Sequence, residues 1–303
     1  MIQHPCPLRI ISLFSGSKGN CTLVRFGDIR ILVDAGMSCR AIERALAAIG
    51  ESPKDIRAVF ITHEHSDHTK ALPVFLKKYP VPVHLTEPTA KELIRAGFPS
   101  DCFAIHTGVF SVTVKDQIAG SEHTDQICIR SFPVPHDSCA CVGYRFSFET
   151  ANGEETEFLP AEYAAIATDM GCVTEEIKNA LRGVKALILE SNHDENMLMM
   201  GSYPYELKRR ILSDHGHLSN GSAASFLCEL VAQGTKHILL AHLSPENNTP
   251  ELAYLTVQAA LQKQGFVQNQ DFALQVARRD SPVTLYDDQG MRDFVPDPTK
   301  GTF

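Results

Sequence analysis

The segment His63-Glu64-His65-Ser66-Asp67-His68 restricts the possible folds of this chain more than any other feature. It follows directly on the apolar run Ala58–Thr62, which is typical of a buried β-strand. Neutral imidazoles and carboxylates are the ligands that zinc and related divalent ions prefer. An exposed polar loop with chance histidines is the alternative, but the spacing directly after a strand favours a metal site. Four potential ligands here can serve two ions, with His63 and His65 on one and Asp67 and His68 on the other.

Three further candidate ligands repeat the same pattern of an apolar strand followed by a polar side chain. They are His136 after Phe132–Pro135, Asp169 after Ala164–Thr168, and His242 after His237–Ala241. Each alone would be an ordinary polar residue at a strand end. Since binding and catalytic residues gather on loops at one end of a sheet, the repetition predicts that all three join the site.

Short apolar runs alternate with helical patterns along the chain. The predicted helices cover Arg40–Ile49 and Ser219–Val231, and others begin after Thr174 and at Thr249-Pro250. The predicted strands are Leu8–Phe14, Cys21–Phe26, Ile29–Val33, Ala58–Thr62, Ile127–Pro133, Gly143–Phe148, Ala164–Thr168, Ala186–Leu189, His237–Ala241 and Ala273–Ala277. This alternation predicts an α/β fold with mixed sheets and helices on the outside.

Composition bounds the organisation of the chain. No composition break divides the 303 residues, so we expect a single domain over residues 1–303. We expect an irregular tail from about residue 287, which is rich in Pro and Asp, and a hairpin tip or loop at Ala151–Glu157.

Charge and cysteine content exclude some classes of protein. The formal net charge of −8 counts against a protein that coats DNA nonspecifically, but it does not exclude a nuclease. Nine cysteines without a C-x-x-C pair indicate reduced thiols in the cytoplasm. No apolar run is long enough to span a bilayer, and the start lacks the pattern of a signal peptide, so we expect no membrane association.

The order HxHxDH, His, Asp, His resembles the metallo-β-lactamase superfamily over most of the chain. The resemblance implies an αβ/βα sandwich of two mixed β-sheets flanked by helices. It further implies that Asp34, in the run Ile31–Gly36, supports the metal ligands from behind. The implied ligand sets are His63, His65 and His136 for one metal and Asp67, His68 and His242 for the other, with Asp169 bridging.

Four segments resemble one branch of that superfamily, the YycJ/WalJ group of bacterial cytosolic exonucleases that act on DNA. They are Ser15–Asn20, Glu190–Asp194, Gly216–Asn220 and His242–Asn248. The resemblance implies cleavage from a strand end with 5′→3′ polarity.

The second half of the chain also resembles the tRNA 3′-processing endonuclease, in which a Glu and a His act beside the metals. The matching positions are Glu190 and His217, and the resemblance implies that Glu190 orients His217. The chain lacks that enzyme's His-Glu-Ala-Thr and His-Ser-Thr runs, so the resemblance does not extend to tRNA processing. The chain also has no room for the inserted domain of β-CASP nucleases.

The region around His217 has a physical interpretation of its own. Ser219-Asn220 begins a helix whose free amides can accept a phosphate. His217 would then be a proton donor beside that phosphate, or merely a neighbour of the helix cap. Ser15–Asn20 is equally consistent with a phosphate-binding nest and with a tight turn. The basic residues that could contact DNA are Lys18, Lys208, Arg209 and Arg210.

These observations predict a metal-dependent phosphodiester hydrolase in which two divalent ions, Zn²⁺ or Mn²⁺ with Fe as a further option, activate a water. Asp67, besides binding metal, would orient the nucleophile, and His217 would assist the leaving oxygen. The expected partner is a nucleic acid, DNA in the first place, with no obligate protein partner. The alternatives are a small-molecule thioesterase or lactonase, which the His217 and Glu190 pair argues against, and a non-enzymatic metal-binding regulatory protein, which the complete ligand set argues against.

Overall fold

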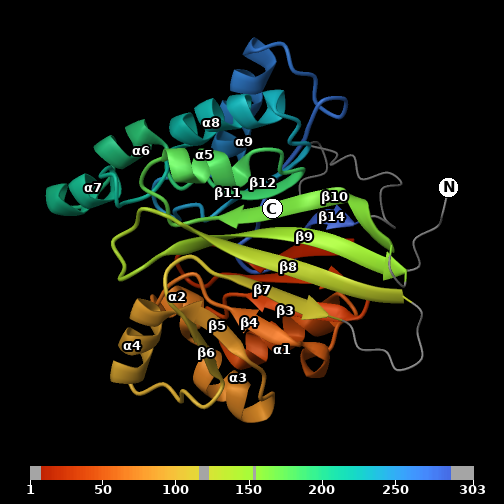
Figure 1. Cartoon of the computed structure of the whole chain (residues 1–303). Helices are drawn as coiled ribbons and strands as arrows, with labels where there is room; N and C mark the ends of the chain where they lie inside the picture. The colour runs from red at the N-terminus through yellow and green to blue at the C-terminus, as the bar shows by residue number, and fades with distance from the viewer. Residues whose placement is uncertain (1–7, 116–122, 153–154, 288–303) are drawn as a thin grey trace.

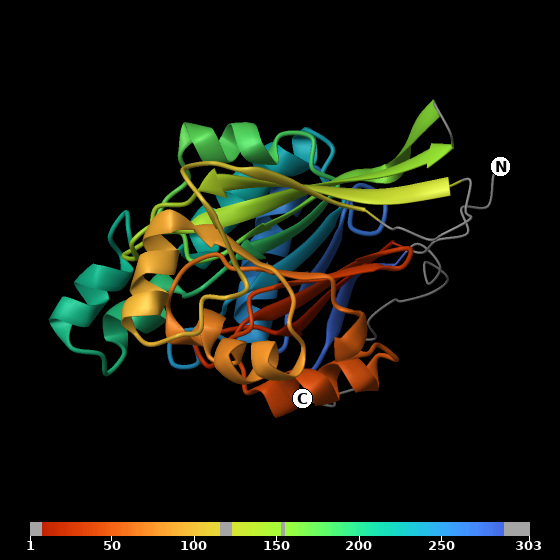
Figure 2. The ribbon, with the colours of Figure 1, turned by 60° about the horizontal axis from the view of Figure 1, so that its bottom comes forward.

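Two seven-stranded β-sheets face each other, and helices cover the outer face of each (Figures 1 and 2). The structure is a computed structural model, and it describes residues 8–115, 123–152 and 155–287. The predicted sandwich of two mixed sheets flanked by helices is confirmed. Within the described residues, no helix combines the length and the apolar character that a bilayer crossing requires.

The first sheet has the strand order β14-β1-β2-β3-β4-β5-β6. Its first four strands pair antiparallel, whereas β3, β4, β5 and β6 run parallel to one another. Because β3 and β4 are parallel, their carboxyl ends open onto the same edge of the sheet. The strands are β1 (Leu8–Phe14), β2 (Cys21–Phe26), β3 (Ile29–Val33), β4 (Ala58–Phe60), β5 (Val83–Thr86), β6 (Phe103–His106) and β14 (Val283–Asp287).

The second sheet repeats this plan, with the order β13-β12-β11-β10-β9-β8-β7. Strands β7 to β10 pair antiparallel, and β10 to β13 run parallel. All five residues of β11 are buried, as expected for a strand between two parallel neighbours with both faces covered. The strands are β7 (Ser111–Lys115), β8 (His123–Pro133), β9 (Val142–Asn152), β10 (Glu155–Ala167), β11 (Ala186–Glu190), β12 (His237–Ala241) and β13 (Ala273–Val276).

Local sequence sets the helix boundaries. In α1 the Ser38 side chain accepts a hydrogen bond from the Ala41 amide, Ile42 and Leu46 are buried, and Gly50 follows the end with φ +76°. Thr174 and Thr249 cap two later helices, as predicted. The helices are α1 (Cys39–Ala48), η1 (Pro53–Asp55), α2 (Ser66–Thr69), α3 (Leu72–Lys78), α4 (Glu87–Arg95), α5 (Glu175–Leu181), α6 (Glu195–Met200), α7 (Tyr205–Ile211), α8 (Asn220–Ala232) and α9 (Pro250–Lys263).

Three apolar clusters form the core. The central cluster fills the space between the sheets and includes Phe26, Phe60 and Tyr144. A second cluster packs α5, α8 and α9 on the second sheet, and a third packs α1, α3 and α4 on the first. The two halves therefore meet through one shared apolar layer, which fixes the facing strand ends relative to each other.

Most predicted strands match the structure within a few residues, but four strands were missed: β5, β6, β7 and β14. Within Ala151–Glu157, β9 ends at Asn152 and β10 begins at Glu155, and the two strands pair antiparallel, so the expected hairpin is confirmed. Residues 288–303, which make up the expected tail, lie outside the described residues.

Candidate metal centre

The candidate ligands, and Glu190 beside them, gather where strands of both sheets end. Parallel pairing sets Leu189 of β11 beside Leu240 of β12, so that the residues that follow the two strands leave the sheet together. The contributions are His63, His65, Asp67 and His68 after β4, His136 after β8, Asp169 after β10, Glu190 as the last residue of β11, and His242 after β12. Asp67 and His68 lie in the short helix α2, with His65 at its N-cap position, although the sequence predicted a loop there.

The first group consists of His63, His65 and His136. One ligand atom from each lies within 4.8 Å of the others. The His63 ring centroid is 4.5 Å from that of His65 and 5.1 Å from that of His136. The structure thus brings together the three imidazoles that the resemblance assigned to one metal.

The second group consists of Asp67, His68 and His242, whose ligand atoms also lie within 4.8 Å of one another. Asp67 Oδ2 is 3.5 Å from His68 Nε2 and 3.7 Å from His242 Nε2. One carboxylate and two imidazoles therefore converge, in the combination predicted for the other metal.

Asp169 lies between the two groups. Its Oδ2 is 3.3 Å from His68 Nε2, and its Oδ1 is 3.4 Å from His242 Nε2 and 3.9 Å from His136 Nε2. The carboxylate thus contacts ligands of both groups, which is the geometry that a bridging ligand requires. Its assignment as the bridge stays a prediction.

Unpaired buried atoms test whether this set fits a cation. His63 Nε2, Asp169 Oδ2 and His242 Nε2 are buried and lack a hydrogen-bond partner among the described residues. The three side chains are at most 3% exposed, and each unsatisfied buried polar atom costs about 1–3 kcal/mol. Imidazole nitrogens and carboxylate oxygens are suitable ligands for divalent ions. The donor set therefore fits bound divalent metal.

Hydrogen bonds on the far side of three imidazoles set their orientation. His68 Nδ1 is 2.8 Å from Asp34 Oδ2, His136 Nδ1 is 3.2 Å from the Gly216 carbonyl oxygen, and His242 Nδ1 is 2.9 Å from Glu190 Oε1. Because Nδ1 donates to these acceptors, Nε2 is the atom left to face the centre, where it can bind a cation once it is deprotonated. Such partners fix the tautomer of metal-binding histidines.

Asp34 supports the ligand segment from behind, at the position that the resemblance implied. It follows β3, is 3% exposed, and accepts hydrogen bonds from the amide and the hydroxyl of Thr62. Gly36, two residues later, packs against the ligand segment so closely that a Cβ atom there would lie 1.6 Å from the Asp67 carbonyl oxygen. The run Ile31–Gly36 therefore supports both His68 and Asp67.

Three site residues have a strained backbone. Asp34, Asp169 and His242 have φ values of 62°, 58° and 58°, in the left-handed region that non-glycine residues seldom adopt. Each follows a strand by one or two residues, so the chain turns sharply as it leaves the sheet. Such conformations cost on the order of 1–3 kcal/mol each and concentrate at functional sites.

Glu190 contacts His217, as the resemblance implied, and also makes contacts that the sequence did not predict. It is fully buried, and its Oε1 accepts hydrogen bonds from both His217 Nδ1, at 2.8 Å, and His242 Nδ1. Its Oε2 accepts from the amides of Met170 and Leu218. Burial raises the pKa of Glu190, but the charge of His217 and these hydrogen bonds outweigh it and lower the pKa. Glu190 therefore stays ionised and holds a candidate ligand as well as His217.

His217 borders both ligand groups. Its ring centroid lies 5.2 Å from that of His136 and 5.3 Å from that of His242, and Nδ1 is 4.0 Å from Asp169 Oδ1. The side chain is 23% exposed, so it is reachable from solvent. Burial lowers the pKa of His217, but Glu190 outweighs it and raises the pKa. Glu190 thus favours the protonated form of this partly exposed imidazole.

The two groups differ in protonation when no metal is bound. Burial lowers the pKa values of His63 and His136, so both are neutral. Burial also lowers the pKa of His68 and His242, but carboxylates outweigh it, with Asp34 acting first on His68 and Asp169 first on His242. The pKa of His68 is then well above its usual value, and that of His242 is raised to about 10. Cations that bind the second group must displace protons.

The segment Ser15–Asn20 forms a tight turn that contacts all three residues of the second ligand group. The Gly19 amide donates to the Gly16 carbonyl, and the Gly16 amide donates to the Asn20 side chain. Asn20 Nδ2 lies 3.0 Å from His68 Nε2 and 3.4 Å from Asp67 Oδ2, and the Ser15 hydroxyl accepts from the His242 amide at 2.8 Å. Sequence alone did not reveal these contacts, because they join residues far apart in the chain.

Ser219 and Asn220, predicted to contact phosphate, have partners within the protein. Ser219 caps α8 by accepting from the Ser222 amide, and its hydroxyl donates to Glu195. Asn220 is 1% exposed, accepts from the Ser191 hydroxyl at 2.6 Å and donates to Asn248. A role in phosphate binding stays a prediction for both residues.

The four basic residues that could contact DNA differ in their exposure and in the partners of their side chains. Lys208 donates to two backbone carbonyls, and Arg210 is paired with Asp137 beside His136. Arg209 stays 65% exposed, with a 3.7 Å contact to Glu206. Lys18 is exposed in the turn after β1.

Comparisons with known proteins point to one family. The sequence profile of the Beta-lactamase superfamily domain matches residues 29–243. The chain is 38% identical to Exodeoxyribonuclease YycJ of Bacillus anthracis over 257 residues, which cover 84% of this chain and 89% of that protein. It is 34% identical to Exodeoxyribonuclease WalJ of Streptococcus pneumoniae over 245 residues, covering 81% and 85%. Among solved structures, the metallo-β-lactamase fold protein YhfI from Bacillus subtilis superposes with a TM-score of 0.57 at 14% identity, covering 92% of this chain and 99% of YhfI.

Proposed function

The chain belongs to the β-lactamase superfamily, and from that premise we propose that it is a metal-dependent nuclease that hydrolyses phosphodiester bonds from a strand end, with DNA as substrate and 5′→3′ polarity. The relatives that match over most of their length are named exodeoxyribonucleases, which supports the nucleic-acid substrate. The polarity is carried over from the resemblance alone. The structural observation that carries the proposal is the Glu190–His217 pair at the edge of the ligand groups.

Two divalent ions per chain, Zn²⁺ or Mn²⁺ with Fe as a further option, would be held by the two groups. His63, His65 and His136 would bind one ion, Asp67, His68 and His242 the other, and Asp169 both. Such ions supply a water of lowered pKa and neutralise charge on a phosphate. The unpaired buried atoms of His63, Asp169 and His242 support this assignment.

The remaining chemistry belongs to side chains of this protein. Asp67, at the border of the second group, would orient the attacking water. His217 would donate its proton to the leaving oxygen, because the charge of Glu190 favours the protonated form of the imidazole. Glu190 would maintain the Nδ1 hydrogen bond and so keep Nε2 directed to the substrate. Backbone amides at the start of α8 would receive a neighbouring phosphate.

The proposal keeps the chain as one domain over residues 1–303, located in the cytoplasm, with no obligate protein partner. The central apolar cluster that both sheets share supports the single domain. The eight cysteines at positions that the structure describes are free thiols, which supports the location.

The test is an assay of purified protein on end-labelled single- and double-stranded DNA and RNA, each with Zn²⁺, Mn²⁺ or Fe²⁺. We expect short products released progressively from 5′ ends of DNA, and no activity after chelation. Internal nicking of circular DNA at the rate of linear DNA would exclude the exonuclease. Efficient hydrolysis of thioesters or lactones with nucleic acids untouched would support the small-molecule alternative. No hydrolysis of any substrate with metal bound would support a regulatory protein.

A further inference from the structure

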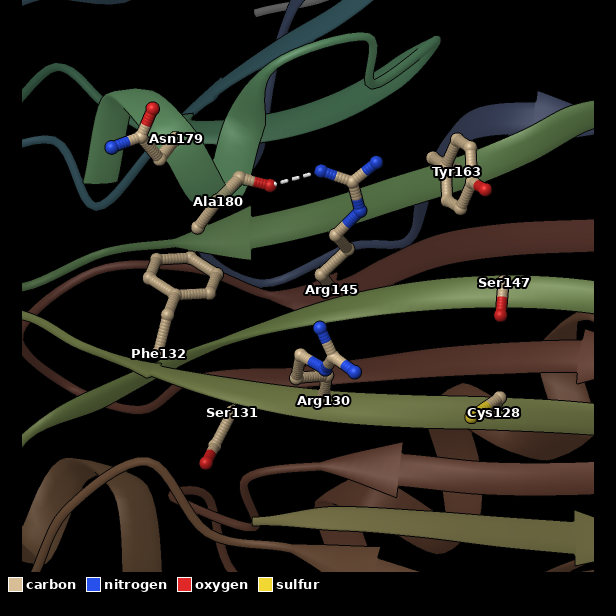
Figure 3. A pocket seen from close by; sticks show the side chains of 9 residues that line it. All are labelled: Cys128, Arg130, Ser131, Phe132, Arg145, Ser147, Tyr163, Asn179 and Ala180. Atoms are coloured by element: carbon tan, nitrogen blue, oxygen red, sulfur yellow. Dashed lines mark hydrogen bonds between the residues drawn. The ribbon is translucent and has the colours of Figure 1, made fainter. Parts of the chain in front are cut away.

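A pocket that contains two arginines lies on the outer face of the second sheet, beside α5 and away from the ligand groups. Its volume is about 450 Å³. Side chains from β8, β9 and β10 form its floor, and α5 forms one wall (Figure 3). We name it the arginine pocket, and its lining residues are Cys128, Arg130, Ser131, Phe132, Arg145, Ser147, Tyr163, Asn179 and Ala180.

Two like charges face each other in this pocket. Arg130 of β8 stands directly opposite Arg145 of β9 in the antiparallel register, and both side chains rise on the same side of the sheet (Figure 3). Like charges directly opposite are destabilising. Neither guanidinium forms an ion pair with any carboxylate whose position the structure describes. An anion between them would remove the repulsion.

Arg145 is held by hydrogen bonds, whereas Arg130 is exposed at the surface. The Arg145 guanidinium donates to the carbonyl oxygens of Ala180 and Arg182 and lies 4.2 Å from the centroid of the Tyr163 ring. Burial lowers the pKa of Arg145, and the charge of Arg130 lowers it further. Arg130 is exposed. One anchored and one adaptable guanidinium form a suitable clamp for a phosphate, because the planar fork matches its oxygens.

Strand β8 connects the pocket to the candidate metal centre. Arg130 precedes His136 by only six residues, so at most about 20 Å of extended chain separates their Cα atoms. One strand of a duplex has a phosphate about every 3.4 Å along the axis, so about six nucleotides cover that distance. A strand with its end at the metal centre can therefore reach the pocket.

We propose that the arginine pocket binds a backbone phosphate of the nucleic-acid strand whose end occupies the metal centre, several nucleotides from the bond that is cleaved. The proposal rests on the proposed function and assigns to it a second contact with the substrate. A free mononucleotide carries the same phosphate chemistry, so the experiment must separate the two sources.

The first measurement is the affinity of chelated protein for a single-stranded 20-nucleotide DNA at several salt concentrations. Arg130→Gln removes the exposed charge without touching a hydrogen bond of the fold. We expect roughly tenfold weaker binding, as for a lost charged hydrogen bond, and a fall of about 0.7 in the slope of log affinity against log salt. Arg44→Gln is the matched control, because Arg44 is an exposed arginine of α1 on the other outer face. An unchanged slope for Arg130→Gln overturns the proposal.

The second measurement distinguishes a mononucleotide from a DNA strand as the ligand of the pocket. It also distinguishes failure of the pocket proposal from failure of the proposed function. If Arg130→Gln weakens binding of dAMP but not of the 20-nucleotide DNA, the pocket is a mononucleotide site and the proposal is overturned. On metal-loaded protein, the kcat/KM for the 20-nucleotide DNA is compared with the kcat/KM for a small chromogenic phosphodiester. We expect Arg130→Gln to lower the ratio of the two roughly tenfold, through a higher KM for the DNA. A wild-type protein that cleaves no nucleic acid refutes the proposed function, while the salt slopes still decide the role of the pocket.

Discussion

Oε1 of Glu190 accepts a hydrogen bond from Nδ1 of His242 at 2.9 Å, and the same oxygen accepts one from Nδ1 of His217. Since the pKa of Glu190 is lowered and the carboxylate has no proton of its own, both imidazoles must donate through Nδ1. One buried side chain thus fixes the tautomer of a candidate ligand and of the candidate proton donor. Changes at Glu190 and at His217 should therefore have different consequences.

Glu190→Gln should weaken metal binding as well as turnover. The amide is nearly isosteric, but its NH₂ group would face either the two imidazole donors or the amides of Met170 and Leu218. Loss of such a supporting hydrogen bond typically costs about 10–100-fold in metal affinity. Competition with a chromogenic chelator measures that affinity. Wild-type metal affinity with reduced turnover would restrict Glu190 to the orientation of His217.

His217→Ala should keep the metals and lose most turnover. His217 lies beside the ligand groups but outside both sets, and general acid catalysis supplies about 10²–10⁴-fold. Metal content by elemental analysis and kcat on a labelled oligonucleotide are the readouts. Loss of metal would make His217 a ligand, and normal turnover would make it structural.

Asp169 should be required for both metals. Asp169→Asn is the informative variant, because asparagine tolerates the left-handed φ of 58° and retains the shape of the side chain while removing its charge. We expect the metal content to fall below two ions per chain and hydrolysis to be abolished. Asp169→Ala should do the same with an added loss of stability. Full metal content in Asp169→Asn would contradict the bridging position.

The sequence predicted the parts of the site that depend on local pattern. An apolar strand followed by a ligand is visible within ten residues, and it identified His63, His136, Asp169 and His242. All of them lie at one edge in the structure, because parallel strands end together. Strands β5 and β6 were missed because each is only four residues long, too short for a sustained alternation or a long apolar run to mark it.

Other features arise only when distant segments meet. The Glu190–His242 bond joins residues 52 positions apart, and the Ser15–His242 bond joins residues 227 positions apart. The resemblance implied that Glu190 orients His217, but it did not reveal that Glu190 also holds His242. The arginine pocket is a further example, since only the register of β8 and β9 sets Arg130 opposite Arg145.

Gly36→Ala should destabilise the ligand segment. The new Cβ would overlap the Asp67 carbonyl oxygen, so the backbones must separate, and overpacking of this kind costs about 1–3 kcal/mol or more. Gly221→Ala in the first turn of α8 is the matched control, because its Cβ would make only contacts of 3.8 Å. Urea unfolding and metal content measure both effects. Equal stability of the two variants would contradict the close approach.

The stabilisation that metal gives should increase as pH rises above about 6.5. Without metal, the raised pKa values of His68 and His242 make their protonated forms favourable in the folded state. That contribution is complete below the unfolded histidine pKa of about 6.5 and is lost as pH rises through the folded values, which for His242 is about 10.

Bound cations replace those protons, so metal competes less with protons at higher pH. The Tm difference between loaded and chelated protein should therefore grow from pH 6.5 to pH 9. The lowered pKa values of His63 and His136 act at the acid end, where the chelated fold loses stability as pH falls below about 6.5. Calorimetric scans at matched ionic strength measure both trends, and His242→Gln should flatten the rise. A Tm difference that shrinks with increasing pH would show that the second group does not carry these protons.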